Sequence, residues 1–244
     1  MDYSRLLEKK RKFDAVKDKI DRVTLSSYEK DFELTFIHNS TAIEGNTLTL
    51  LETKVVLEDG VAVGGKALRE IYEVVNHKKA YGYVKKCIAD GEKLDENKVK
   101  DIHEILTENI MPGGIYRNCE VRISGAGFTP PSGMLMFDRI KAFFEDLKVK
   151  QENVSDAVEL AAWAHAEFVS IHPFADGNGR ASRLIMNYIL MSNGLLPVSV
   201  AKENRLEYYK ALEEYAVNGN IDIFSRFTAE LEEQRLDEYL SLNK

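Results

Sequence analysis

The chain has 244 residues, and its 33 basic and 40 acidic side chains give a formal net charge of −7, which does not favour a nucleic-acid-binding surface. Hydrophobic residues make up 44% of the chain, enough to bury a sizeable core, so disorder is excluded for most of it. The 5 prolines and 15 glycines are too few for the many turns of an all-β domain. We therefore expect an all-α fold.

Hydrophobic periodicity predicts a series of helices joined by short turns. In the first half we expect a charged amphipathic segment at about 3–20, a helix capped by Ser26 or Ser27 that ends near Gly45-Asn46, a short helix capped by Thr49, a long helix at about 67–89, and a helix capped by Asp95. In the second half we expect helices at about 135–149, 155–170, 179–193, 203–217 and 221–240. Because we find no repeat and no linker, we expect one domain over residues 1–244.

Residues 111–134 interrupt the helical pattern. Glycines and prolines surround Val121, Arg122 and Ile123, whose side chains alternate with the period of a strand. This composition predicts a short β-hairpin on the helical scaffold.

No stretch of the sequence approaches the roughly 20 apolar residues of a membrane span, and residues 1–16 lack the apolar core of a secretory signal. We therefore expect a cytoplasmic protein without a membrane partner. Cys87 and Cys119 have neither CxxC spacing nor a histidine at ligand spacing, which argues against a zinc site or a disulfide.

The segment HPFADGNGRASR at 172–183 carries the pattern of a phosphate site. Gly177 and Gly179 let backbone N–H groups converge on an anion at the start of a helix. Arg180 and Arg183 lie three residues apart on one face of the first turns, where positive charge opposes the helix dipole unless an anion is bound. The segment therefore predicts a polyphosphate ligand.

Two further side chains of this segment can carry chemistry. Asp176 offers a carboxylate that can hold Mg²⁺ against a polyphosphate, since Mg²⁺ is usually bound by one or two protein oxygens plus phosphates and waters. His172 precedes the phosphate-binding turn and is the natural general base. A lone histidine or a lone arginine pair is more often structural, but their order within twelve residues indicates a catalytic site.

The segment resembles the HPFxDGNGRxxR signature of the Fic domain family and matches it at every specified position. The resemblance extends to Ala161, His165 and Phe168, to the middle hairpin and to Tyr208-Tyr209, so it covers roughly residues 30–230. It implies an all-helical fold with a β-hairpin flap. It also implies the transfer of AMP from ATP to a Tyr, Thr or Ser hydroxyl of a target protein, with release of pyrophosphate.

The resemblance implies a role for each matched residue. His172 would deprotonate the target hydroxyl, and Asp176 would hold Mg²⁺ or Mn²⁺. The implied ATP contacts are Gly177, Asn178, Gly179, Arg180, Arg183 and Tyr208. Ala216 stands where relatives carry an asparagine, so the adenosine end matches less well than the phosphate end. We interpret His165 as a structural residue that packs or makes a local hydrogen bond.

The hairpin at about 115–134 resembles the flap of this family. The resemblance implies that its exposed edge pairs with an extended stretch of the target and so brings the hydroxyl near His172. The residues expected to line this edge, and counted with the ATP- and phosphate-binding residues, are Val121, Arg122, Ile123 and Ser124.

A second motif, STAIEG at 40–45, resembles the inhibitory signature [S/T]xxxE[G/N] of the family, on a helix expected at about 28–45. Ser40 and Glu44 are four residues apart and share one helix face. The resemblance implies that Glu44 pairs with Arg183 and keeps the γ-phosphate from its productive position, because one guanidinium cannot bind both a carboxylate and a triphosphate.

Several functions remain open beside autoinhibited AMP transfer. Relatives with this architecture can also remove AMP from the target, and others transfer phosphate or phosphocholine. A non-catalytic, nucleotide-responsive binding module is a further alternative, although binding alone would not need His172. We expect ATP and a target protein as partners, with a homodimer possible and no nucleic acid.

Overall fold

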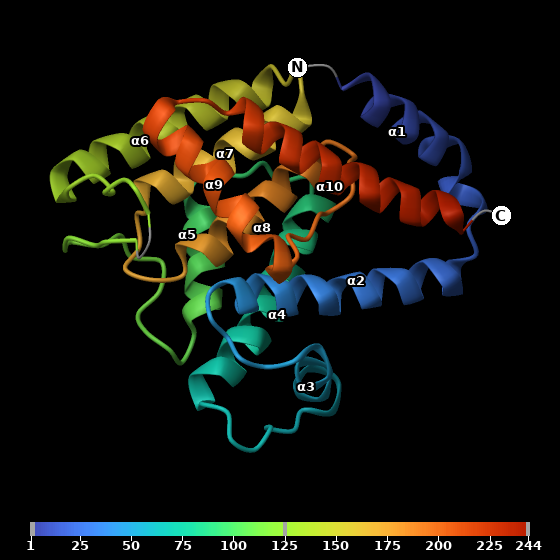
Figure 1. The fold of residues 1–244 in the computed structure, drawn as a ribbon, viewed down its shortest axis with the longest axis horizontal. Helices are drawn as coiled ribbons and strands as arrows, with labels where there is room; N and C mark the ends of the chain where they lie inside the picture. The colour runs from blue at the N-terminus through green and yellow to red at the C-terminus, as the bar shows by residue number, and fades with distance from the viewer. Residues whose placement is uncertain (1–2, 124–125, 243–244) are drawn as a thin grey trace.

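The computed structural model describes residues 3–123 and 126–242, and among these it contains ten α-helices and no strand (Figure 1). The helices are α1 (Ser4–Val16), α2 (Arg22–Ile43), α3 (Leu50–Lys54), α4 (Leu68–Ala89), α5 (Glu96–Thr107), α6 (Gly133–Glu152), α7 (Ala157–Ile171), α8 (Asn178–Ser192), α9 (Arg205–Asn218) and α10 (Asp222–Ser241). Shorter turns are η1 (Lys17–Lys19) and η3 (Lys202–Asn204), both of 3₁₀ type, and the π-helical η2 (Val55–Asp59). The prediction of an all-α fold is confirmed.

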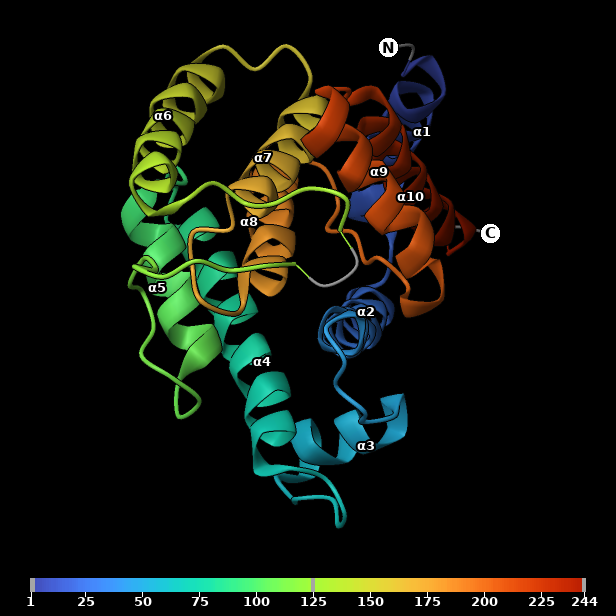
Figure 2. The same cartoon turned by 60° about the vertical axis from the view of Figure 1, so that its left-hand side comes forward.

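Helix α8 lies in the middle of the molecule and contacts α2, α4, α5 and α7 (Figure 2). Nearly all of its residues are buried, and they include the polar Asn178, Arg180, Ser182, Arg183 and Asn187. Its neighbour α7 presents small side chains, including Ala161, Ala162 and Ala164, each fully buried. Small side chains let two helices approach closely, and the resulting α7–α8 pair carries the 172–183 segment in its connecting turn.

The two ends of the chain and the short α3 attach to this centre. Helix α1 packs along α10, where the rings of Phe13 and Tyr239 meet edge to face with their centroids 5.6 Å apart. A smaller apolar cluster that includes Ile37, Leu48 and Val56 fastens α3 and η2 to α2 and α4. The segment that follows α2, which contains α3 and η2, is therefore held against both α2 and α4.

The cap residues explain where the helices begin. The predicted caps Thr49 and Asp95 are confirmed, the first as a capping box with Glu52. The predicted caps Ser26 and Ser27 are wrong. Helix α2 begins one turn earlier because the Asp21 carboxylate accepts the N–H of Thr24 at 2.9 Å, and the two serines lie inside the helix.

The predicted β-hairpin is not seen in the described part of residues 115–134, hereafter the flap segment. Its backbone groups bond elsewhere: Gly127 donates its N–H to Glu213 at 2.7 Å, and the carbonyl of Cys119 accepts from Arg117. Pro130 and Pro131 have no N–H to give to a ladder. Val121, Arg122 and Ile123 are therefore not paired as a strand, and Ser124 lies outside the described residues.

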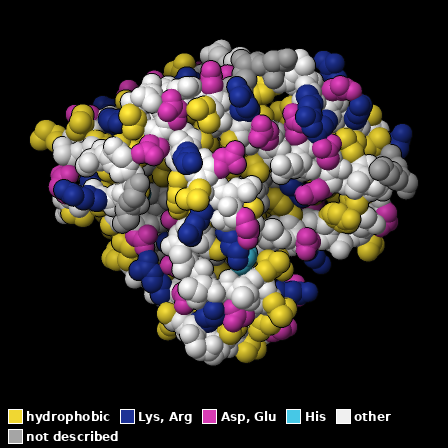
Figure 3. All heavy atoms as spheres, viewed as in Figure 1, with side chains coloured by type: hydrophobic (Ala, Val, Ile, Leu, Met, Phe, Trp, Pro, Cys, Tyr) yellow, Lys and Arg dark blue, Asp and Glu magenta, His cyan; other side chains and the backbone are white. Residues whose placement is uncertain are grey.

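In the part of the chain that the structure describes, no helix is both long and apolar enough to cross a membrane. On the face shown in Figure 3, acidic and basic side chains are interspersed. This face therefore has no extended surface of one charge.

Candidate active site

The turn between α7 and α8 has the backbone that the sequence predicts for an anion site. His172 ends α7 in the left-handed region, with φ 51°, and Gly177 precedes α8 with φ 78°. The buried Asn178 side chain closes the turn from inside, donating to the carbonyl of Phe174 at 2.8 Å and accepting its N–H at 2.9 Å. The first N–H groups of α8 have no acceptor within the helix, so they are available to an anion at this end.

His172 has the protonation state of a base. Its Nδ1 lies 3.3 Å from the carbonyl oxygen of Val169, which can only accept, so Nδ1 carries the proton and Nε2 keeps its lone pair. Burial lowers the pKa of His172 below its ordinary value, and the charge of Arg117 lowers it further. The imidazole is therefore neutral at physiological pH.

Arg183 is almost completely buried, and each of its nitrogens is bonded. Nε donates to Ser40 Oγ at 2.9 Å, and Nη1 donates to the Tyr208 hydroxyl at 3.2 Å. Nη2 donates to the Ser40 carbonyl at 2.6 Å and to Glu44 Oε1 at 2.8 Å. The structure thus brings the 40–45 motif, the 172–183 motif and Tyr208 together at one guanidinium.

The Glu44 carboxylate lies over the start of α8. A Cβ atom added at Gly179 would be 2.1 Å from Glu44 Oε1. The carboxylate thus occupies the space directly above a glycine of the turn, at the positive end of the helix. An anionic group of this chain already sits where the sequence predicts a phosphate.

Arg180 is as deeply buried as Arg183 but has far fewer partners. Among the described residues, its Nε and Nη1 have no hydrogen-bond partner. The nearest carboxylates, on Asp176 and Glu73, lie 3.7 and 3.9 Å away, beyond hydrogen-bond distance. A buried guanidinium with unsatisfied donors is costly, and an anionic ligand would satisfy them.

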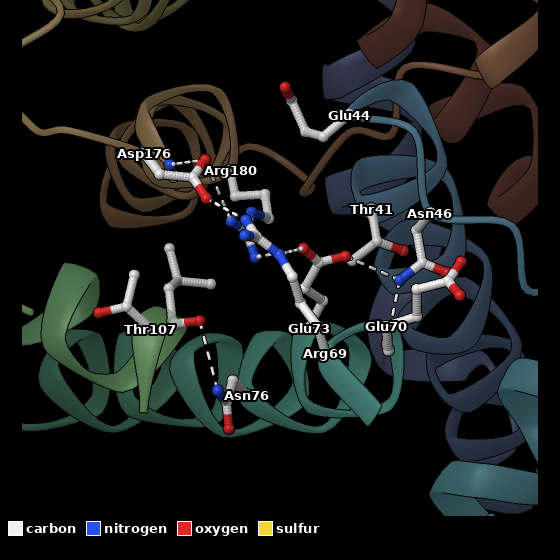
Figure 4. A network of polar contacts seen from close by, with 12 residues as sticks. Thr41, Glu44, Asn46, Arg69, Glu70, Glu73, Asn76, Thr107, Asp176 and Arg180 are labelled. Atoms are coloured by element: carbon white, nitrogen blue, oxygen red, sulfur yellow. Dashed lines mark hydrogen bonds and ion pairs between the residues drawn. The ribbon is translucent and has the colours of Figure 1, made fainter. Parts of the chain in front are cut away.

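The Asp176 carboxylate takes part in a polar network that reaches Asn46, directly after the 40–45 motif (Figure 4). It accepts the N–H of Gly177 and forms an ion pair with Arg69. Arg69 Nε donates to Glu73 Oε1 at 3.1 Å, and Glu73 Oε2 accepts from Asn46 Nδ2 at 2.9 Å. Residues 44–46 are therefore joined to both Asp176 and Arg183.

Asp176 fits a divalent cation that arrives with phosphate. Burial alone would raise the pKa of its carboxyl, but Arg180, the Gly177 N–H and Arg69 outweigh burial and lower the pKa. The carboxylate is therefore ionised at neutral pH. Within residues 3–123 and 126–242, no group of three or more His, Cys, Asp or Glu side chains forms a metal site. One carboxylate is enough for Mg²⁺ only when phosphate oxygens supply further ligands.

Three buried histidines outside the motif support this site, and only His165 was noted in the sequence. His77 Nε2 lies 2.7 Å from Ser40 Oγ, and His103 Nε2 lies 2.9 Å from the Asp176 carbonyl. His165 Nε2 lies 2.9 Å from the Tyr208 hydroxyl, which is the local hydrogen bond expected as one of its two structural roles. In the sequence, each of these histidines is a polar residue at an apolar position of a predicted helix. This pattern indicates a buried histidine but not the group to which it bonds.

These histidines make the fold sensitive to acid. Burial lowers the pKa of His77 to about 3 and that of His103 to about 4, from 6.5. The unfolded chain then binds more protons between pH 6.5 and 4, so stability falls as the pH falls through this range. His77 and His103 should each cost about 2 kcal/mol of unfolding free energy between pH 7 and 5. Urea titrations at both pH values measure the total loss, which His77→Gln should reduce by about 2 kcal/mol; an equal loss in His77→Gln would contradict this account.

Comparisons with known proteins indicate the family of the chain. Residues 93–190 match the model of the Fic/DOC family. The chain is 36% identical over 243 residues to protein adenylyltransferase Fic from Aedes aegypti, covering 98% of this chain and 47% of that protein. It is 35% identical to protein adenylyltransferase Fic from Nematostella vectensis, covering 94% and 55%. The chain spans about half the length of the curated relatives it matches.

Solved structures show the same fold. Fic-1 from C. elegans superposes with a TM-score of 0.85 at 28% identity, covering 98% of this chain and 70% of that chain. A Fic domain containing signaling protein from Bacteroides thetaiotaomicron superposes with a TM-score of 0.88 at 23% identity, covering 98% and 96%. By its matched residues, its relatives and its fold, the chain belongs to the Fic/DOC family.

Proposed function

We propose that this chain is a protein adenylyltransferase that moves AMP from ATP, with Mg²⁺ or Mn²⁺, to a hydroxyl side chain of a target protein and is inhibited by Glu44. The observation that carries the proposal is the pair of buried guanidinium groups at the start of α8. Arg180 has unsatisfied donors, and Arg183 is paired with a carboxylate that lies over Gly179. We interpret these groups as a polyphosphate site in which the Glu44 carboxylate occupies the position of one phosphate group.

The residues of the chain divide the reaction between them. His172 Nε2 takes the proton of the target hydroxyl as its oxygen attacks the α-phosphorus, and the bond to the bridging oxygen of pyrophosphate breaks. Backbone N–H groups at Gly177, Asn178 and Gly179, with Arg180 and Arg183, hold the phosphates and stabilise the charge that develops on their oxygens. A divalent cation held by Asp176 would neutralise part of that charge.

The target would dock at the flap segment. Support comes from exposed positions along it, Ile115 and Arg122 among them, and from its direct connection to the His172 loop through Arg117. An extended target chain needs main-chain partners rather than particular side chains. Tyr208, whose hydroxyl accepts a hydrogen bond from Arg183 at 3.2 Å, would contact the nucleotide beside that guanidinium.

Labelled ATP tests the proposed reaction. Purified Glu44→Gly protein is incubated with a lysate, or alone with its own chain as acceptor, and with ATP labelled at either the α or the γ phosphorus. Retention of label from the α position only is expected. Retention from the γ position only would indicate phosphate transfer, and ATP binding without any retained label would indicate a binding module; either result would overturn the proposal.

The ion pair between Arg69 and Asp176 should lower the affinity for the metal. A cation that binds Asp176 has to displace Arg69, so Arg69→Gln should increase the factor by which Mg²⁺ tightens ADP binding. Both side chains are partly exposed, at 56% and 40%, and such pairs contribute little, so an increase of about two- to fivefold is expected.

Calorimetric titrations of ADP with Mg²⁺ and with EDTA measure this factor. Arg139→Gln is the matched control, because Arg139 pairs with Glu167 at 2.6 Å outside the site and its loss should leave the factor unchanged. An unchanged or smaller factor in Arg69→Gln would show that Arg69 does not compete with the metal.

A further inference from the structure

Arg117 joins the flap segment to the backbone of the proposed general base. It is only 3% exposed, and all three of its guanidinium nitrogens donate to main-chain carbonyls. Nε donates to His172 at 2.8 Å, Nη1 to Cys119 at 2.7 Å and Nη2 to Pro131 at 2.6 Å. Its backbone N–H donates to Pro173 at 2.9 Å. One residue thus connects both arms of the flap segment with the first two residues of the 172–183 motif.

Arg117 is held by hydrogen bonds to main-chain carbonyl oxygens rather than by an ion pair. Within residues 3–123 and 126–242, no carboxylate lies within ion-pair distance of Arg117, so its charge is satisfied by carbonyl dipoles. A buried cation is costly, and an apolar side chain of similar volume would fill the space without that cost. The rigid, planar fork of a guanidinium fixes three acceptors at set positions, which neither an apolar side chain nor a lysine can do.

The carbonyl of His172 that accepts this hydrogen bond belongs to a strained backbone conformation. A non-glycine residue in the left-handed region is strained, and His172 has φ 51°. A hydrogen bond from a charged donor is among the stronger hydrogen bonds in proteins and can offset that strain. The bond from Arg117 Nε is made directly to the carbonyl that this conformation orients.

We propose that Arg117 is a positioning residue for the transfer reaction: it holds the left-handed backbone of His172, and so directs the imidazole, while fixing the two arms of the flap segment relative to it. The base and the surface that presents the hydroxyl are then placed by the same side chain. The inference rests on the proposed function, since it assigns Arg117 a part in that reaction.

The charge of Arg117 gives the proposal a second readout. Burial lowers the pKa of His172, and Arg117 lowers it further, whereas the carboxylates of Glu44 and Asp176 act in the opposite direction. Removal of the positive charge favours the imidazolium. The pKa of His172 should therefore rise in Arg117→Met.

The test compares Arg117→Met and Arg117→Lys in the Glu44→Gly background, with Arg139→Met as the control. We expect kcat for AMP transfer to fall about tenfold to a hundredfold in both variants, because small misplacements of a reacting group have effects of this size. The dissociation constant of ADP should stay within about twofold, because Arg117 makes no contact with Arg180 or Arg183. The lysine variant keeps the charge without the fork, so its loss of kcat identifies positioning.

Histidine NMR titration, with His172→Ala to assign the signal, provides a readout independent of turnover. A kcat within twofold of the background in Arg117→Met, or an unchanged His172 titration there, would overturn the proposal. Should Arg117→Met fail to fold, the lysine variant decides in the same way through kcat and the affinity for ADP. If the Glu44→Gly background transfers no AMP, the proposed function fails, while the titration still decides whether Arg117 holds His172.

Discussion

Replacing His172 with alanine is expected to lower the rate of AMP transfer by about 10²- to 10⁴-fold, the usual contribution of a positioned general base. ADP binding should not weaken, because the imidazole acts on the proton of the target hydroxyl and makes no ground-state contact with phosphate. Single-turnover transfer of α-label by Glu44→Gly and by Glu44→Gly/His172→Ala measures the change. A transfer rate equal to the background would remove His172 from the mechanism.

The pH dependence identifies the base by a separate route. Burial lowers the pKa of His172 from 6.5, so the neutral form persists below pH 6.5 and the rate should fall only at lower pH. This fall in rate at acidic pH is caused by protonation of the imidazole, so it should be missing from the pH dependence of the residual activity of His172→Ala. An identical acidic limb in that variant would assign the base elsewhere.

The parts of the site that could be predicted are those formed by residues close together in sequence. The turn over 172–183 carries its glycines, arginines and capping geometry within one loop, so its backbone follows from local sequence. The caps Thr49 and Asp95 are local in the same way. The start of α2 was misplaced because Asp21 and the two serines are all good caps, and sequence alone does not rank them.

The parts that could not be predicted depend on side chains that meet through the fold. Arg69 reaches Asp176 from a helix more than a hundred residues earlier in the chain, and Arg117 bonds only to carbonyls, which leave no trace in the sequence. The flap segment was predicted as a hairpin from its alternating side chains. Its backbone instead bonds to Arg117 and Glu213, and the two adjacent prolines remove donors that a ladder requires.

The Glu44–Arg183 pair lies between these cases. Residues 139 positions apart give no periodic or local signal, so the pairing could be expected only from the resemblance of two short motifs to one family. The structure adds what the motifs omit: the bond from Arg183 to the Ser40 hydroxyl, the contact of His77 with that hydroxyl, and the position of the carboxylate over Gly179. Helix α2 is held at several points, so loss of the Glu44 carboxylate alone need not displace it.

For this reason Glu44→Gly is expected to raise AMP transfer without unfolding α2. The carboxylate leaves Arg183 Nη2 and the space over Gly179, and the γ-phosphate can take both. A hydrogen bond between charged groups contributes about 1.5–3 kcal/mol, so transfer should rise about tenfold to a hundredfold. Label from α-labelled ATP, on the chain itself or on a target, measures the increase, and Glu44→Gln, which keeps the volume but loses the charge, should give a smaller increase.

The double variant separates regulation from structural support. Arg183→Ala also breaks the ion pair, but it removes the phosphate ligand that the loss of Glu44 makes available, so Arg183→Ala should be inactive with or without Glu44. The two substitutions are then strongly non-additive in activity. A purely structural salt bridge would behave differently, because its loss from either side would lower the free energy of unfolding and leave activity per folded molecule roughly unchanged. If folded Glu44→Gly protein binds ATP as the wild type does and transfers no more AMP to any hydroxyl acceptor, its own chain included, Glu44 is a structural partner of Arg183 and not an inhibitor.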